Sequence, residues 1–441
     1  MPSSLPQVAD ALQRVLTEVP AALARETGFC RRCSKVTAAC FVQATVLGWL
    51  AHPAATLHHL TQRAADQGVA LSPQGLAQRF TPAAADLLRR VWEAALTEVV
   101  AADPATAGLL ARFPAVVLLD STTVALPDGL AAVWVGCGGR VAQGSQAALK
   151  LTVRLDLVGG GLAALASDGR AQDKASPLQL APRPAGALRV ADLGFWSLDV
   201  LRGIADQRAY FLSRLHLQTA VFAADGARLD LVTWLEQRRR RRLSVAVTLG
   251  VEARVPARLL AVQVPGRVAE ARRAAIRADA QRDGKPPSAL KLALAGWTLL
   301  VTNAPPDLLA IRDALVLARA RWQIELLFKL WKRDGHLDEW RSANPARILC
   351  EVYAKLTALV IQHWLLLVGC WRYPDRSLTQ AAQTVRDHAV GLLLALPGRA
   401  RRLAVLRAIC RGMAHGGRIA SRRRQPSLFQ LLDDPSLSRF A

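Results

Sequence analysis

Segments typical of β-strands are confined to the middle of the chain, between two long stretches with a helical pattern. The run PAVVLLD, from Pro114, is suited to a buried strand, and ALKLTVRLDLV and GLAALAS follow at hairpin spacing. ALRVADLGFW then leads from a strand into the helical pattern SLDVLRGIADQ, and AYFLSRL is a further strand. This order predicts an α/β fold, a mixed sheet flanked by helices.

A second group of strands follows, in a segment of different composition. Between residues 215 and 305, LSVAVTLGV, LLAVQVP and WTLLVTN have the pattern of strands, and AEARRAAIRADAQRDG has that of an arginine-rich helix. Proline-containing turns punctuate the end of this segment. We therefore expect a β-rich insertion subdomain at 215–305, within a core formed by 106–214 and 306–375.

The two ends of the chain are predicted to be helical, residues 1–105 as an N-terminal DNA-binding domain and 376–441 as a C-terminal region. ATLHHLTQRAADQG, closed by Gly68, and the following LSPQGLAQRF resemble a helix-turn-helix. In that interpretation Gln74, Gln78 and Arg79 contact DNA, although two ordinary packed helices explain the pattern equally well. The tail from Arg399 to Arg424 holds nine arginines and no acid, and its last part, HGGRIASRRRQPS, is expected to be flexible.

The charge of the chain indicates a polyanionic partner. Its 57 lysines and arginines against 34 acids give a net charge of +23 and a pI of about 11.1. A membrane surface would need an anchor, but the N-terminus has no apolar signal core, and polar residues interrupt the apolar runs Val36–Gln62 and Leu356–Trp371. We expect buried helices and a location in the bacterial cytoplasm, at the nucleoid.

The seven cysteines are scattered and odd in number, which predicts free thiols. Cys30 and Cys33 form the one suggestive pair. A zinc site would need His58 and His59 as further ligands; two cysteines at a helix start are the simpler interpretation.

The stretch ARARWQIELLFKLWK, residues 318 to 332, places one acid among cations and apolar side chains. On a helical wheel Glu325, Lys329 and Lys332 lie within about 80° of Arg321, and apolar residues fill most of the circle. The pattern predicts a buried helix whose narrow charged stripe faces a polar cavity or a ligand. A buried carboxylate needs partners, which the cations or a metal ion would supply.

Two further acids follow apolar runs that have the pattern of buried strands. Asp120 ends AVVLLD and Asp192 ends LRVAD, and the ends of strands in open sheets are where sites lie. Asp156, in the middle of the VRLDLV run, is a rival for either role. Three carboxylates favour Mg²⁺ or Mn²⁺, and two such ions would activate water against a phosphodiester. Metal-dependent chemistry on DNA is the resulting hypothesis.

Three blocks of the sequence resemble the catalytic blocks of DDE transposases of the insertion-sequence-four family. They are VVLLDSTTVALP, VADLGFWSLDVLRGIADQRAYFLSRL and WTLLVTNAP followed by RWQIELLFKLWK. Arg321, Glu325 and Lys332 match the spacing of the family signature Y-x-x-R-x-x-x-E-x-x-x-x-x-x-K, but Ala318 stands at the tyrosine position. The resemblance implies a ribonuclease-H-like core, interrupted by a β-strand insertion before the catalytic glutamate.

The resemblance also implies roles for single residues. Asp120, Asp192 and Glu325 match the acids that bind two Mg²⁺ ions, for which Mn²⁺ substitutes. Arg321, Lys332 and Lys329 match cations that contact DNA phosphates, Trp297 a tryptophan that stacks on a flipped base, and Arg214 a basic position near DNA. Trp297 packing a strand onto the core is an equal alternative. Weaker candidates for contact with DNA are Lys150, His216 and the run Arg238–Arg242.

The implied activity is cut-and-paste transposition of an insertion sequence. The protein would nick double-stranded DNA at terminal inverted repeats, and the freed 3′-hydroxyl would attack the opposite strand or target DNA, within a homodimeric synaptic complex. Two alternatives stay open. One is a catalytically silent or domesticated DNA-binding protein, which Ala318 makes worth considering, and the other is a nuclease without strand transfer.

Overall fold

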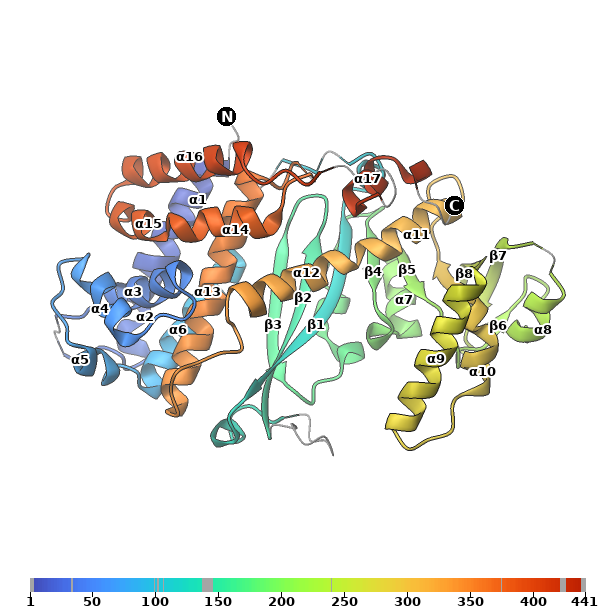
Figure 1. The fold of residues 1–441 in the computed structure, drawn as a ribbon, viewed down its shortest axis with the longest axis horizontal. Coiled ribbons are helices and arrows are strands. Elements are labelled where there is room, and N and C mark those ends of the chain that lie inside the picture. Colours follow the sequence, from blue (N-terminus) through green and yellow to red (C-terminus); the bar gives the residue numbers. More distant parts are fainter. Residues whose placement is uncertain are drawn as a thin grey trace.

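A nine-stranded mixed sheet runs through the centre of the computed structural model, with a helical region on one side and the inserted segment on the other (Figure 1). The structure describes residues 4–32, 35–98, 100, 103–105, 107–136, 146–238, 240–373, 375–420 and 426–437. In spatial order the strands are β3 (Leu162–Asp168), β2 (Ala147–Asp156), β1 (Val116–Leu126), β4 (Leu188–Ala191), β5 (Tyr210–Arg214), β9 (Trp297–Thr302), β8 (Val255–Gln263), β7 (Arg242–Leu249) and β6 (Val221–Phe222).

The first five strands form the core of the sheet. β1, β2 and β3 are antiparallel, whereas β4 and β5 run parallel to β1, so that Leu119 pairs with Ala191. The helix α7 (Leu198–Asp206) makes the connection from β4 to β5, as a parallel pair of strands requires. The predicted α/β fold with a mixed sheet is confirmed, and the arrangement is consistent with a ribonuclease-H-like core.

The inserted segment continues the same sheet. β9 pairs antiparallel with β5 on one side and with β8 on the other, and β7 and β6 complete the sheet. Its helices are α8 (Leu231–Glu236), the arginine-rich α9 (Gly266–Arg282) and α10 (Ala289–Ala293). An apolar cluster that includes Phe211, Leu259 and Val301 packs beneath them and extends to α7. The three strands and the helix predicted here are all present.

Helices from both ends of the chain pack into one region beside β3 (Figure 1). They are α1 (Ser4–Gln13), α2 (Val19–Glu26), α3 (Ala38–Ala51), α4 (Leu57–Ala65), α5 (Pro73–Ala77), α6 (Pro82–Thr97), α13 (Pro345–Gly369), α14 (Leu378–Asp387), α15 (Ala389–Ala395) and α16 (Arg399–His415). α13 packs against α3 and α6, and α16 packs against α1. The N-terminal and C-terminal helices therefore share one hydrophobic core.

The helix α13 is the centre of this region. Within the described part of the chain it alone is long and apolar enough to cross a membrane, yet 89% of its most apolar window is buried inside the protein. Its buried ion pair, Lys355 Nζ to Glu351 Oε1 at 2.8 Å, also lies inside the protein. These observations agree with the predicted core helix.

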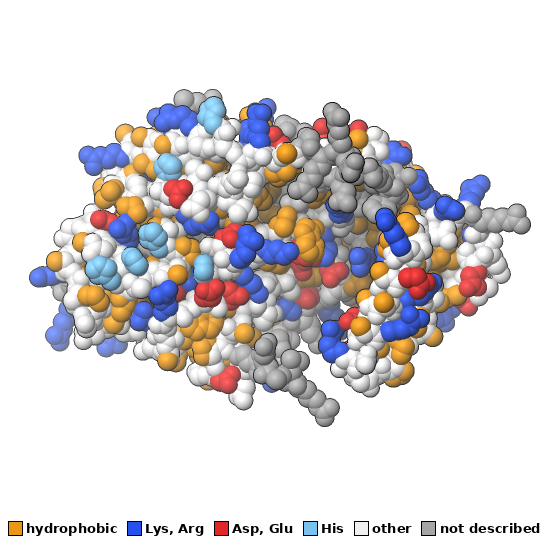
Figure 2. Space-filling model, viewed as in Figure 1, with side chains coloured by type: hydrophobic (Ala, Val, Ile, Leu, Met, Phe, Trp, Pro, Cys, Tyr) orange, Lys and Arg blue, Asp and Glu red, His pale blue; other side chains and the backbone are white. Residues whose placement is uncertain are grey.

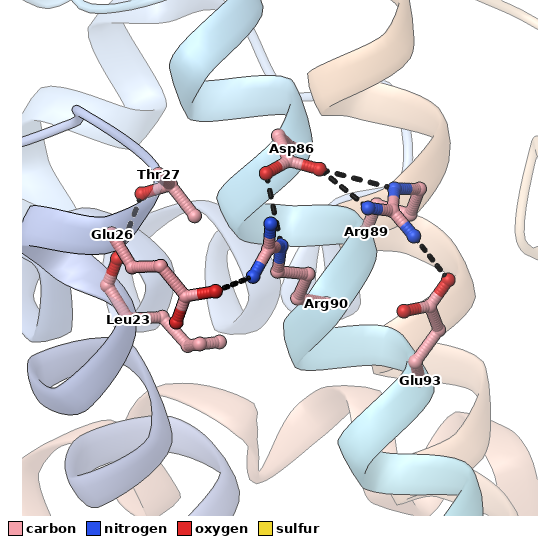
Figure 3. A network of polar contacts seen from close by, with 7 residues as sticks. All are labelled: Leu23, Glu26, Thr27, Asp86, Arg89, Arg90 and Glu93. Atoms are coloured by element: carbon pink, nitrogen blue, oxygen red, sulfur yellow. Dashed lines mark hydrogen bonds and ion pairs between the residues drawn. The ribbon is translucent and has the colours of Figure 1, made fainter.

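Ion pairs neutralise several arginines on the helical region (Figure 3). Arg89 contacts Asp86 and Glu93 on its own helix, each at 2.6 Å. Arg90 contacts Asp86 at 3.0 Å and also Glu26 of α2, which ties α6 to α2. Part of the basic excess of the chain is therefore held in structural contacts.

The helix-turn-helix interpretation finds little support. Ser72 caps α5 as predicted, accepting a hydrogen bond from the backbone N–H of Gly75 at 3.0 Å. However, α5 has only five residues, because Thr81 caps the next helix directly afterwards. Gln74 and Gln78 are exposed and Arg79 is half-buried. Two ordinary packed helices describe this segment better, and contact of these three residues with DNA stays a prediction.

The C-terminal region contains a further short helix past α16. Residues 421–425 of the expected flexible tail lie outside the described residues. Beyond them, α17 (Leu428–Asp433) packs against α11 (Ile311–Ala320), with Leu431 and Leu432 buried. The backbone N–H of Leu109 donates to the carbonyl of Leu432 at 2.9 Å, which fixes this helix to the core.

Candidate active site

Two of the predicted acids lie on neighbouring parallel strands. Because Leu119 pairs with Ala191, the next residues along β1 and β4 are Asp120 and Asp192. Asp192 directly follows β4, as predicted, and precedes the short turn Leu193–Phe195. We expected Asp120 to end its strand as well, but it does not. β1 continues to Leu126, because its polar residues still pair with β2 along its whole length.

The third acid is brought to them by the helix after the insertion. α11 is followed by α12 (Trp322–Lys329), which carries Glu325, and Arg321 stands at their junction. The Arg321 guanidinium donates from Nη1 to Oδ2 of Asp120 at 2.7 Å and from Nη2 to Oε1 of Glu325 at 2.5 Å. One side chain of the predicted signature thus joins two of the predicted acids.

The electrostatics of Asp120 place Asp192 in the same site. Burial raises the pKa of Asp120 above its ordinary value, and the nearby charges of Asp192 and Glu325 raise it further. The backbone N–H of Ser121 and the Arg321 guanidinium act in the opposite direction. Asp120 therefore lies close enough to both other acids for their charges to act on it, and Arg321 is its ion-pair partner.

The donor set suits a hard divalent cation, since carboxylate oxygens are the ligands that Mg²⁺ and Mn²⁺ prefer. Within the described ranges, however, no three side chains of the metal-binding types come close enough together to hold a metal ion. The Arg321 guanidinium lies between Asp120 and Glu325 and holds both. Metal binding by the three acids stays a prediction.

The rival acid Asp156 has a structural task. Its carboxylate accepts hydrogen bonds from the backbone N–H groups of Val116, Val158 and Gly159, each at 3.0 Å. It thereby fixes the turn after β2 against the start of β1. A carboxylate so fully engaged is a poor candidate for a catalytic ligand.

The helix α12 is less buried than predicted. Ile324 and Leu327 are buried, but the side chains of Trp322 and Leu326 remain 46% and 40% exposed. Lys329 is exposed beside them, with its Nζ 4.4 Å from the centre of the Trp322 ring. Trp322 and Leu326 face open space and not protein. The apolar pattern around this helix therefore did not mean that the helix is buried all round.

The open space next to this helix is a cavity of about 930 Å³. It is bounded by α11, α12 and α17, and Asp192, Arg214, Arg321 and Ala318 are among its lining residues. Figure 2 shows hydrophobic and acidic side chains gathered at the centre of this face, where Figure 1 places α12, with basic side chains beside them. Asp192 and the Arg321 side chain that holds the other two acids therefore line a hollow large enough for part of a substrate.

The other predicted contacts divide into those at the cavity and those away from it. Arg214, at the exposed end of β5, lines the cavity, as does Arg319, which the sequence did not single out. Lys332 Nζ donates to the carbonyl of Thr123 at 2.7 Å, next to the acids. Trp297 begins β9, is half-buried against the apolar cluster of the insertion, and is not among the residues that line the cavity.

The weaker candidates have contacts of their own. Lys150 pairs with Asp173 at 2.8 Å, and the His216 ring stacks on Trp196 with 6.2 Å between ring centres. Arg238 lies over the Trp234 ring, whereas Arg239, within the same arginine run, is outside the described residues. Cys30 is a free thiol, and Cys33, its suggested zinc partner, also lies outside the described residues.

Comparison with known proteins agrees with this geometry. The family model described as Transposase DDE domain matches residues 111–361, which is more than half of the chain. The chain is 27% identical over 383 residues to the transposase for insertion sequence element IS231F of Bacillus thuringiensis subsp. israelensis, covering 80% of this chain and 78% of that protein. It is 25% identical over 368 residues to the transposase for element IS231B of Bacillus thuringiensis subsp. berliner, covering 77% and 75%.

The matched segment begins just before β1 and ends within α13, so it contains all three acids, Arg321 and the inserted strands. The fold, the arrangement of the acids and the family model thus lead to one assignment: the chain belongs to the family of transposases that carry the DDE domain, and it is a DNA transposase.

Proposed function

We propose that this transposase cuts and joins DNA with Asp120, Asp192 and Glu325 as its metal-binding acids. The observation that supports it most is the single guanidinium of Arg321 shared by Asp120 and Glu325, with Asp192 close enough to raise the pKa of Asp120. Two Mg²⁺ ions, or Mn²⁺ in their place, would supply an activated water and stabilise the leaving oxygen.

Arg321 has a second task in this proposal. A guanidinium prefers a phosphate as much as a carboxylate, because its fork matches both geometrically. When the DNA backbone enters the cavity, its phosphate competes for Arg321 and releases the two carboxylates. The acids would then become available to metal only where a substrate is present.

The substrate that fits is double-stranded DNA bearing terminal inverted repeats, followed by target DNA. Arg214, Arg321 and Lys329 offer positive charge along the cavity. Lys332 would contact phosphate near the acids, and Trp297 would stack on an extruded base. We assign residues 1–105 to DNA binding, with Gln74, Gln78 and Arg79 as contacts, 106–214 and 306–375 to the catalytic core, 215–305 to the insertion and 376–441 to the C-terminal region.

The reaction proposed is nicking at each end of the element, followed by attack of the 3′-hydroxyl on the opposite strand or on target DNA. Both ends must be held together for this, which a homodimer in a synaptic complex provides. The substrate places the protein at the nucleoid of the bacterial cytoplasm.

A cleavage assay on DNA carrying the terminal inverted repeats tests the proposal. The wild type should nick the repeat ends with Mg²⁺ or Mn²⁺, whereas Asp192→Asn should bind the same DNA and not cut it. Asp199→Asn, an exposed acid in the first turn of α7, is the matched control and should cut normally.

The alternatives give different results in the same assay. A silent DNA-binding protein would bind the repeats without cutting in either metal. A nuclease without strand transfer would cut with no preference for the repeats and leave no joined products. Normal cutting by Asp192→Asn would overturn the assignment of the acids.

A further inference from the structure

Three arginines cluster on the face of the sheet opposite the acids. Side chains alternate along β1 and β4, so Asp120 and Asp192 lie on the face of Leu118 and Val190, which belongs to the main core. Arg189 of β4 lies on the other face. Arg154 of β2 lies there too, because it pairs with Leu119, and Arg183 reaches the cluster from the loop before β4.

Among the described residues, the partners of these guanidiniums are uncharged oxygens. Arg189, 2% exposed, donates to the side-chain oxygen of Gln179 and, at 3.2 Å, to the carbonyl of Phe195. Arg183 donates to the backbone carbonyl of Gln179, and Arg154 Nη2 to that of Pro182 at 3.0 Å. Nε of Arg189 and both Nε and Nη1 of Arg183 are buried and have no hydrogen-bond partner.

The positive charges of the cluster act on one another. Burial, together with the charge of Arg183, lowers the pKa of Arg189 to about 9. Burial, together with the charge of Arg154, lowers the pKa of Arg183 to about 10. The acid that favours the charge of Arg154 is Asp156, whose carboxylate is already engaged by three backbone N–H groups.

Other arginines of the molecule are paired with carboxylates. On α6, Arg89 and Arg90 are matched by Asp86, Glu93 and Glu26 (Figure 3). Within the described residues, none of the three clustered arginines forms an ion pair with a carboxylate, although one of them is fully buried. A buried charge without a counter-charge costs free energy, so we expect an anion to bind this cluster.

We propose that Arg154 and Arg183 bind a phosphoryl anion on this face of the sheet, with Arg189 behind them as a fixed positive charge. Both side chains are half-buried, so the cluster borders solvent, and arginine forks match phosphate oxygens two at a time. The anion is either free phosphate or a backbone phosphate of a DNA segment other than the one at the acids.

The proposed site adjoins the catalytic strands without sharing residues with the catalytic site. The Phe195 carbonyl that accepts from Arg189 belongs to the turn that begins after Asp192. An anion bound by this cluster would therefore stabilise that turn from the face of the sheet opposite the acids. The proposal does not depend on cleavage activity and can fail or succeed independently of it.

Thermal unfolding in inorganic phosphate, against chloride at equal ionic strength, tests the site on the full chain. Phosphate should raise the Tm of the wild type, and its apparent affinity should be about tenfold weaker in Arg154→Gln and Arg183→Gln. Arg267→Gln, an exposed arginine of α9, is the control for loss of one charge and should match the wild type. Arg189 is left intact, because a fully buried side chain is the one whose loss endangers folding. Equal stabilisation of the wild type and Arg183→Gln, or none beyond chloride, would overturn the proposal.

A second arm identifies the source of the phosphoryl group. Binding of a duplex without terminal repeats is measured for Arg183→Gln and Arg267→Gln, with and without phosphate. Weaker binding by Arg183→Gln alone, together with competition by phosphate, supports a DNA backbone contact. Equal duplex binding by the two variants, together with phosphate stabilisation that is weaker in Arg183→Gln than in Arg267→Gln, supports a free phosphate site.

Discussion

Arg321 donates to Asp120 across 2.7 Å, although the two residues lie 201 positions apart in the sequence. The contact joins the start of α12 to the middle of β1, and through the same guanidinium it includes Glu325. An ionic contact within the site itself thus helps to hold α12 against the sheet. Anything that competes for Arg321 acts on both acids together.

Loss of Arg321 should therefore tighten metal binding while it weakens activity. In Arg321→Gln the carboxylates of Asp120 and Glu325 lose their cation and repel one another, so Mn²⁺ affinity in calorimetric titration should rise on the order of tenfold. Cleavage should fall, because the phosphate loses its guanidinium. Arg341→Gln, an exposed arginine before α13, should change neither. A weaker Mn²⁺ affinity in Arg321→Gln would contradict the competition between guanidinium and metal.

Lys329 should act as a phosphate contact of no sequence preference. It is exposed on the cavity side of α12, next to Trp322. Lys329→Gln should weaken binding of all duplexes alike and reduce the slope of log affinity against log salt by about one. Lys285→Gln, an exposed lysine on the loop after α9, is the comparison. An unchanged slope would show that Lys329 does not touch the backbone.

A tyrosine should fit at position 318. Ala318 lines the cavity, so a larger side chain meets open space there, and Ala318→Tyr should cost less than about 1 kcal/mol of unfolding free energy in urea. Ala320→Tyr, at a fully buried alanine two residues further on, should cost more, about 1–3 kcal/mol. If the signature tyrosine helps to hold DNA, Ala318→Tyr should also bind the terminal repeats more tightly. Equal destabilisation by the two changes would mean that the cavity is not open at 318.

His363 should make the fold sensitive to mild acid. Its ring is buried, and Nε2 lies 2.7 Å from the Gly160 carbonyl, which requires a hydrogen on that nitrogen. Burial lowers its pKa from 6.5 to about 4. The unfolded chain therefore takes up the proton first, and the unfolding free energy should fall by about 3 kcal/mol between pH 6.5 and pH 4.

The matched variant for this prediction is His363→Gln, whose amide can donate to the same carbonyl and does not titrate. Urea unfolding at several pH values should show a shallower acid dependence for the variant than for the wild type. Parallel curves would show that His363 does not carry the effect.

The strands were predictable because their signals are local. Apolar runs mark β1, β2 and β7 to β9, and the spacing from Arg321 to Lys332 is read along one helix. The pairing of β9 with β5 is not local, since the whole insertion separates them, and no pattern within either strand specifies its neighbour. For that reason the sequence predicted a β-rich insertion but not that its strands continue the central sheet.

Burial was harder to predict than secondary structure. The wheel of α12 showed apolar residues on both sides, but whether Trp322 meets protein or a cavity depends on where α17 and β5 lie. The departure at Ala318 was visible in the sequence; the hollow beside it was not. α17 itself has only six residues, too few to be stable alone, and it is stabilised by packing on α11.

The continuity of the sheet determines which fragments of this protein could stand alone. β5 gives its outer hydrogen bonds to β9, so a version shortened by removal of the insertion would leave β5 with an open, unpaired edge beside the acids. Such edges recruit foreign strands and lead to aggregation. The inserted segment therefore also protects the edge of β5, and a variant without it would need another element to pair with that edge.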